Sequence, residues 1–223
     1  MVSTFDFQNI FNNFQLFNYF YFDVNQIKKP ELTGNIGSFL PNGKNLVEIL
    51  DFLNKTQPET FANISLSLIG EMEGINGLEV DNSTFMPTLK LKEEIGSNQH
   101  ILDIWNASDG TMHFIAIMTA ILSYQNSIGI MIEEPERHLH MKVLSYILNN
   151  MRDCQSQIFL TTHSTEMLSL LELNEIIFMF RDFNGDTKGI RAKDIKNIKK
   201  IMKRYKNDLV EMIKCGIVGE YDE

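Results

Sequence analysis

The second half of the chain alternates between helical periods and short continuous apolar runs. A helix is expected after residues 107–111, because apolar side chains recur at helical spacing over 114–122. Two apolar runs follow, at 128–132 and 157–161, and an amphipathic helix over about 139–151 separates them. A strand, a helix and a strand with short connections predict a right-handed crossover between parallel strands. The pattern therefore predicts an α/β fold with a mostly parallel sheet flanked by helices.

The first half of the chain predicts a strand, two helices and a hairpin. Residues 15–24 are rich in Phe and Tyr and favour a strand. Apolar residues recur at helical spacing over 45–53 and again over 57–73. Residues 75–80 and 88–91 alternate between apolar and polar, which is typical of a hairpin with one solvated face.

Composition and charge narrow the class of protein. The 223 residues are 43% hydrophobic and 22% charged, as in an ordinary globular domain. A formal charge of −9 repels phosphate backbones, which excludes a protein that coats nucleic acid with its whole surface. Cys154 and Cys215 are far apart and suggest neither a disulfide framework nor a zinc site. With no basic residue before Lys28 and no long apolar stretch, we expect a cytoplasmic protein without a membrane span.

Polar residues that could take part in binding or catalysis lie where the predicted elements begin and end. Ser108 or Asp109 would cap the helix that follows residue 107. Glu133 and Glu134 end the first apolar run, and His163 follows the second. Because the carboxyl ends of parallel strands meet at one edge of a sheet, we expect these acids and the histidine to converge there.

Three motifs in this region together resemble a known family. The chain carries SDGT at 108–111, EEPE at 133–136 followed by HLH, and TTHS at 161–164. This order and spacing resemble the carboxyl half of ABC-type ATPases, closest to the soluble bacterial AAA/ABC ATPases related to the SMC, RecF and OLD families. The resemblance is strong over 107–170 and looser in the flanks, at the NGKNL of 42–46 and the terminal GIVGEYDE.

The SDGT motif resembles the signature loop of that family. The resemblance implies that Ser108, Asp109 and Gly110 face the γ-phosphate of an ATP molecule bound to an opposing subunit. A helix amino terminus suits this role, because its unpaired N–H groups and dipole attract anions.

The two remaining motifs resemble the Walker B and switch segments. The resemblance implies that Glu133 holds Mg²⁺, that Glu134 orients the attacking water, and that His163 is the switch histidine near the γ-phosphate. Glu133 stands where the family commonly has Asp, whose side chain is shorter. Positioning and charge neutralisation of this kind supply most of the catalysis in phosphoryl transfer.

No segment of the chain matches the phosphate-binding pattern G-x-x-x-x-G-K-[ST]. Residues 37–44 contain one residue too many between the glycines, and Asn45 replaces the required hydroxyl residue. The resemblance therefore implies the second half of a P-loop ATPase core. The leading hypothesis is an ATP-binding, ATP-hydrolysing switch module that uses ATP and Mg²⁺. It would complete a composite dimeric ATP site with a second copy, or with a lobe or partner that supplies the Walker A loop.

Two alternative hypotheses assign the chain to other functional classes. A degenerate ATPase half could serve as a non-catalytic interaction or scaffold module. His138 and His140, beside the nearby glutamates, could instead form the metal site of a hydrolase. Residues two apart on a helix point in different directions, so that pair would chelate well only in a strand.

We expect three segments along the chain. Residues 1–100 would form a strand and helix segment of the ATPase core with a helical insertion, and residues 101–183 would hold the signature, Walker B and switch motifs. Residues 184–223 would form a basic helical segment, the best candidate for contact with nucleic acid or an acidic partner. Its basic residues in a helical context are Lys188, Arg191, Lys193, Lys196, Lys199, Lys200, Lys203, Arg204 and Lys206.

Overall fold

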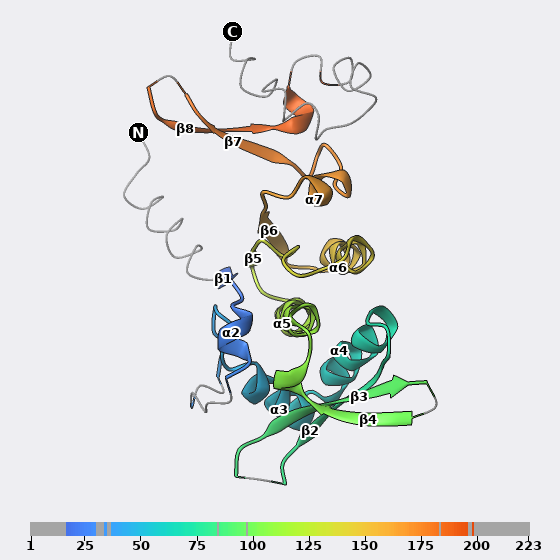
Figure 1. The fold of residues 1–223 in the computed structure, drawn as a ribbon. Helices are drawn as coiled ribbons and strands as arrows, with labels where there is room; N and C mark the ends of the chain where they lie inside the picture. The colour runs from blue at the N-terminus through green and yellow to red at the C-terminus, as the bar shows by residue number, and fades with distance from the viewer. Residues whose placement is uncertain are drawn as a thin grey trace. The chain divides into compact units, whose positions relative to one another are not determined.

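The computed structural model describes residues 17–29, 34, 37–83, 85–96, 98–182, 184–195 and 198. The chain forms two compact units, residues 1–162 and 163–223. Figure 1 shows the elements of both, and each unit is described by itself.

A three-stranded parallel sheet organises the first unit. Its order is β1 (Phe17–Phe20), β5 (Gly129–Glu133) and β6 (Gln157–Thr161), with β5 in the centre. Both pairings are parallel, and Glu133 lies opposite Thr161. The predicted α/β class with a parallel sheet is confirmed.

The first strand is shorter than the expected 15–24, of which residues 15 and 16 lie outside the described part. After β1 the chain turns away because Asp23 caps a short helix, α2 (Val24–Ile27), through a side-chain bond to the N–H of Asn25. The N–H groups of Tyr21 and Asp23 bond the carbonyls of residues 41 and 42 at 2.8 and 3.1 Å. The loop at residues 41–42 therefore lies beside residues 21–23, which follow β1.

Two helices connect the strands of this sheet. Helix α5 (Asp109–Ser123) precedes β5, and α6 (Met141–Asp153) joins β5 to β6. Ser108, not Asp109, caps α5, since its Oγ accepts the N–H of Thr111 at 3.1 Å. Every residue from 111 to 121 is buried. The amphipathic helix predicted over 139–151 is confirmed, and its buried face consists of Val143, Leu144, Ile147, Leu148 and Met151.

The segment between β1 and α5 holds two helices and a second, antiparallel sheet. The two predicted helices are α3 (Leu46–Thr56) and α4 (Pro58–Glu71), with Pro58 in the first turn of α4. The predicted hairpin is β2 (Ile75–Asp81) with β3 (Thr88–Ile95).

The antiparallel sheet contains a third strand that was not predicted, β4 (Asn98–Asp103), paired with β3. Its residues are mostly exposed, so their sequence carries no apolar alternation that would reveal a strand. A single 3₁₀ turn, η1 (Ile104–Asn106), leads from β4 to Ala107 and the start of α5.

The NGKNL segment at 42–46 has a structural role. The buried amide of Asn45 accepts the N–H of Leu40 at 2.8 Å and donates to the carbonyl of Ser38 at 2.9 Å. Gly43 has a φ of +79°, and a Cβ there would lie 2.9 Å from Ile27. These two residues therefore fix the loop against α2 and start α3.

The second unit contains α7 (Thr165–Ser169) and a hairpin of β7 (Ile177–Arg181) and β8 (Thr187–Arg191), followed by a 3₁₀ turn, η2 (Ala192–Asp194). Ile176 and Ala192 form its small core, with Leu168, Leu171, Leu173 and Phe178 packed against them.

The basic segment expected to be helical differs in its described part. Lys188 and Arg191 lie on strand β8, because Asn184-Gly185 forms a hairpin turn instead of a helix start. Residues 196, 197 and 199–223 lie outside the described residues, so contact of this segment with nucleic acid or an acidic partner stays a prediction. The three segments proposed from the sequence also stay predictions. No helix in the described ranges is long and apolar enough to cross a membrane.

Candidate functional site

The loop after β5, residues 134–140, has an unusual backbone. Glu134 and His138 have φ angles of 43° and 61°, a left-handed conformation that non-glycine residues rarely adopt. The N–H of Glu134 donates to the carbonyl of Thr161 at 2.9 Å, and the N–H of Arg137 donates to the carbonyl of Glu134 at 3.1 Å. The first of these hydrogen bonds ties the loop to the end of β6. Backbone strain of this kind concentrates at functional sites.

Glu133 is held by a tyrosine from the neighbouring strand. Tyr19 on β1 donates its phenolic O–H to Oε1 of Glu133 at 2.6 Å. This hydrogen bond, followed by partial burial and the nearby negative charge, raises the pKa of Tyr19 to about 12. The phenol therefore stays protonated at neutral pH and fixes the Glu133 carboxylate at the sheet edge.

The other two glutamates of the EEPE motif also have partners. Glu134 forms an ion pair with Arg137, three residues further on, and its side chain is 27% exposed. Glu136 Oε1 accepts the hydroxyl of Thr162 at 2.5 Å, which joins the loop to the end of β6 a second time. Glu136 Oε2 is buried and has no hydrogen-bond partner among the described residues.

The SDGT loop contacts the loop after β5. A Cβ on Gly110 would lie 2.5 Å from the backbone oxygen of His138, so only glycine fits at this position. Asp109 forms an ion pair with Lys28 at 2.6 Å, and this hydrogen bond lowers the pKa of the Asp109 carboxyl. The amino terminus of α5 therefore lies beside the loop that carries Glu134.

A buried histidine lies beneath this contact. His113 on α5 is 1% exposed. Its ring lies 6.2 Å from that of His138 and next to the backbone of Glu134 and Pro135. Burial, followed by the charge of His138, lowers the pKa of His113 to about 4. His113 is therefore neutral at pH 7 and packs the signature helix against the strained loop.

His163 is the first residue of the second unit. Its side chain is exposed, and the next residue, Ser164, caps α7 by accepting the N–H of Met167 at 3.2 Å. The parallel register of Glu133 and Thr161 supports the expectation that both strands end at one edge of the sheet.

The histidines of the HLH sequence lie in the loop rather than on a strand. His138 is exposed with a positive φ, and His140 directly precedes α6. Within the described ranges, no three His, Cys, Asp or Glu residues come together in a way that could hold a metal ion. A protein-built metal centre therefore has no support in this part of the chain.

The donor set suits Mg²⁺ better than a metal that needs several protein ligands. Mg²⁺ prefers hard oxygen ligands and usually binds through one or two carboxylates, with water and phosphate oxygens as its other ligands. Glu133 is an exposed carboxylate at the carboxyl end of the central strand, which suits such a ligand.

Comparison with family models identifies residues 12–169 as a match to the family described as "AAA domain, putative AbiEii toxin, Type IV TA system". The chain belongs to this AAA-domain family. Membership of an AAA-domain family supports a nucleotide-binding ATPase in general. The comparison with curated proteins gives no match.

Solved SMC heads share the fold of this AAA-domain chain at low sequence identity. A structure titled for ATP-driven dimerization and DNA-stimulated activation of SMC ATPases has a TM-score of 0.52 and 15% identity, over 71% of this chain and 96% of that one. An SmcHead bound to the C-winged helix domain of ScpA has a TM-score of 0.53 and 14% identity, over 75% of this chain and 52% of that one.

A third solved structure is an Smc head domain with an extended coiled coil, bound to the C-terminal domain of ScpA and derived from Pyrococcus furiosus. It has a TM-score of 0.49 and 14% identity, over 72% of this chain and 40% of that one. This chain thus spans about half or less of two of the three SMC chains.

Sequence reasoning missed Tyr19, Thr162 and His113. Each acts across a contact between segments distant in sequence, and its partner depends on strand order and helix packing. The alternation of Tyr19 and Tyr21 in the sequence was the single available signal.

Gly110→Ala should lower the free energy of unfolding by about 1–3 kcal/mol, because the new methyl group must displace the backbone at His138. Gly70→Ala is the matched control, since a Cβ on this helical glycine meets nothing within 4 Å. It should raise stability by a few tenths of a kcal/mol. Urea denaturation measures both, and equal stability of the two variants would contradict the close approach.

His113 should make stability depend on pH. Its pKa of about 4 lies below the usual value of 6.5, so the unfolded chain binds more protons between these values. Stability should be fully present above pH 6.5 and fall by up to about 3 kcal/mol as pH drops to 4. His113→Leu should flatten this slope in urea denaturation series. His100→Gln, at an exposed position on β4, should keep it. An unchanged slope in His113→Leu would be the contrary result.

Proposed function

We propose that this chain is an ATP-binding and ATP-hydrolysing switch module of the ABC type. It completes a composite dimeric ATP site with a lobe or partner that supplies the Walker A loop. The observation that carries the proposal is the contact between the SDGT loop and the strained loop after β5, which carries two acids at the carboxyl end of the central strand. In open α/β sheets, ligands bind at the carboxyl ends of the strands.

The residues of this chain would divide the work of phosphoryl transfer. Glu133 would hold Mg²⁺, and bound Mg²⁺ neutralises charge on the phosphate oxygens. Glu134 would orient the attacking water and accept its proton after release from Arg137, and His163 would stabilise charge at the γ-phosphate. Ser108, Asp109 and Gly110, as residues of the proposed signature loop, would present the amino terminus of α5 to the ATP of the opposing subunit.

The sheet itself supports a missing partner lobe. One face is buried in the core, where Phe20 and Ile132 are each 1% exposed. The opposite face presents Tyr19 and Phe159, which are 42% and 41% exposed, and Tyr21, directly after β1, is 46% exposed. Parallel sheets normally have both faces covered by helices, so this aromatic face is suited to a further layer.

One edge of the sheet is also suited to a further strand. The loop at 41–42 lies beside the continuation of β1, whereas β6 pairs only with β5 among the described strands. Residues of β6 alternate between exposed and half-buried. An unpaired edge with apolar side chains favours strand addition. We therefore place the Walker A lobe next to β6 and over the aromatic face.

Coverage of the SMC structures is consistent with this arrangement. The likeness extends over 52% of an SmcHead chain but 96% of a shorter SMC ATPase chain. ATP-driven dimerization is described for SMC ATPases, and we propose the same response for the assembled form of this protein.

A scaffold role is the second candidate, and specific contacts favour it. Glu133 is bonded to Tyr19, and Glu134 is paired with Arg137. If these contacts persist in the assembly, the two acids are not available for Mg²⁺ and water. The module would then act through its interfaces alone.

The chain by itself should bind ATP weakly and should not hydrolyse it, because its sequence has no P-loop to hold the β-phosphate. Calorimetric titration with ATP and Mg²⁺, together with phosphate release, measures this. A Kd below about 1 µM, equivalent to roughly 8 kcal/mol of binding free energy, with steady turnover would contradict the proposal.

Glu134→Gln should abolish turnover in an assembly that hydrolyses ATP, and nucleotide binding should persist. The assembly to test is this chain co-expressed with the coding sequence immediately upstream, if that encodes G-x-x-x-x-G-K-[ST]. The amide keeps the side-chain shape but cannot accept the proton from water. Glu59→Gln, at an exposed position on α4, is the control and should retain full activity.

A fall in turnover of less than threefold in Glu134→Gln, about 0.7 kcal/mol of barrier, would remove Glu134 from catalysis. In the same assembly, Glu133→Gln should weaken Mg²⁺-dependent binding instead. Association that is insensitive to ATP in every variant would favour the scaffold role.

A further inference from the structure

The antiparallel sheet of the first unit has two edges that differ in character. Its order is β2-β3-β4, so β2 and β4 are its edge strands among the described residues. The register of β2 with β3 shifts between Ile75 and Gly77, and Glu79 and Asp81 add charge to this strand. Irregular register and charge are the features that keep an edge strand from pairing with another chain.

Strand β4 lacks these protective features. It pairs with β3 without a register shift, and its first five residues include no Asp, Glu, Lys, Arg or Pro. Residues 98–101 are exposed, and Ile101 is 68% exposed. No described strand lies on the side of β4 that faces away from β3. The backbone groups on that side are therefore suited to pairing with a further strand.

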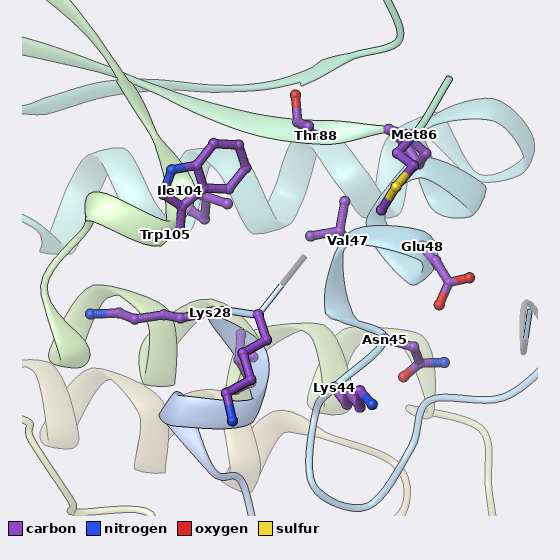
Figure 2. Close-up of a pocket in the computed structure, with 12 residues that line it drawn as sticks. Lys28, Lys44, Asn45, Val47, Glu48, Met86, Thr88, Ile104 and Trp105 are labelled. Atoms are coloured by element: carbon purple, nitrogen blue, oxygen red, sulfur yellow. The ribbon is translucent and has the colours of Figure 1, made fainter. Parts of the chain in front are cut away.

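Strand β4 is held in an extended conformation by the rest of the first unit. Six consecutive residue pairs join it to β3 along its whole length. Ile104, directly after β4, is 2% exposed. Figure 2 shows Ile104 and Trp105 at a small pocket that Val47 of α3 also lines. Because the strand is already ordered, the addition of a partner strand costs less conformational entropy.

The sequence of β4 is complementary to itself in an antiparallel pairing. If Ile101 lies opposite Ile101 of a second copy, each Gln99 lies opposite Asp103 of the other copy. The glutamine amide can donate to the carboxylate, and the two isoleucines can pack between these polar pairs. Residues 99, 101 and 103 share one face of the sheet, so this register keeps all three pairs together. No like charges lie opposite each other in it.

We propose that β4 is a dimerisation strand, at which two copies of this chain pair antiparallel about a two-fold axis at Ile101. The pairing joins two three-stranded sheets into one sheet of six strands, a common size. It is isologous, so it closes at two copies and does not continue into a fibre. A pair of short strands buries little surface, which makes the dimer weak and reversible. The interface uses no nucleotide and none of the residues of the proposed ATP site.

Sedimentation of the full chain without nucleotide, over a series of concentrations, measures this dimer. The unchanged chain should pass reversibly from monomer to dimer as its concentration rises. Ile101→Lys should weaken the dimer at least about tenfold, because two like charges then lie opposite each other. Leu66→Lys is the matched control, since Leu66 on α4 is 64% exposed and lies outside β4. It should dimerise like the unchanged chain.

Cysteine cross-linking tests the register, in a background that carries Cys154→Ser and Cys215→Ser. Ile101→Cys should form a disulfide between two copies under mild oxidation. Opposite residues of antiparallel strands have Cα atoms about 4.5–5.5 Å apart, which is within the reach of a disulfide. Gln99→Cys should not form one, because its counterpart lies four residues further along the partner strand, about 14 Å away.

Three results would overturn the proposal. They are a chain that stays monomeric without nucleotide at every concentration, equal weakening of the dimer by Ile101→Lys and Leu66→Lys, or equal cross-linking of Gln99→Cys and Ile101→Cys. A dimer that forms only with ATP would belong to the proposed composite ATP site instead. The two proposals therefore fail separately.

Discussion

Burial of helix α5 is the constraint on which the first unit depends. All residues from 111 to 121 are buried, so the helix has no solvated face and its position is fixed by neighbours on every side. Its amino terminus carries the SDGT loop, and its second turn carries His113 under the loop that follows β5. A shift of this helix would therefore move both loops together. Such a connection suits a switch, because closely packed interiors change between discrete arrangements rather than deforming smoothly.

The sequence was sufficient to predict the helices and strands whose apolar residues recur with a clear period. Helices α3, α4, α5 and α6 and the parallel strands β5 and β6 lie where their apolar patterns predict them. Strand β4 was missed because its exposed residues have no apolar alternation. Lys188 and Arg191 were assigned to a helix by the charge of the segment, yet the Asn184-Gly185 turn decides for a hairpin. Local turn chemistry outweighed a pattern of charge in this case.

The site was predictable only as far as topology determines it. Parallel register brings the end of β5 to the end of β6, which follows from a strand, helix and strand with short connections. The bond from Tyr19 to Glu133 depends on which strand lies beside β5, and sequence alone does not give strand order. Gly110 was first interpreted as part of a phosphate-binding loop, but its contact with His138 supplies a packing reason as well. The two reasons are compatible, because the position that must lack a side chain lies in the loop that contacts the strained backbone at His138.

The central claim is that the sheet of this chain is completed by another lobe along β6. Amide hydrogen exchange of the chain alone, resolved to single residues, tests it most directly. Strand β5 has partners on both sides, so its amides should be protected along its length. In β6, over residues 157–161, alternate amides should exchange at nearly unprotected rates, because their N–H groups face the edge at which no described strand pairs with β6. Protection of every β6 amide to the level of β5 would show that the edge is already paired, and would contradict a sheet that awaits a Walker A lobe.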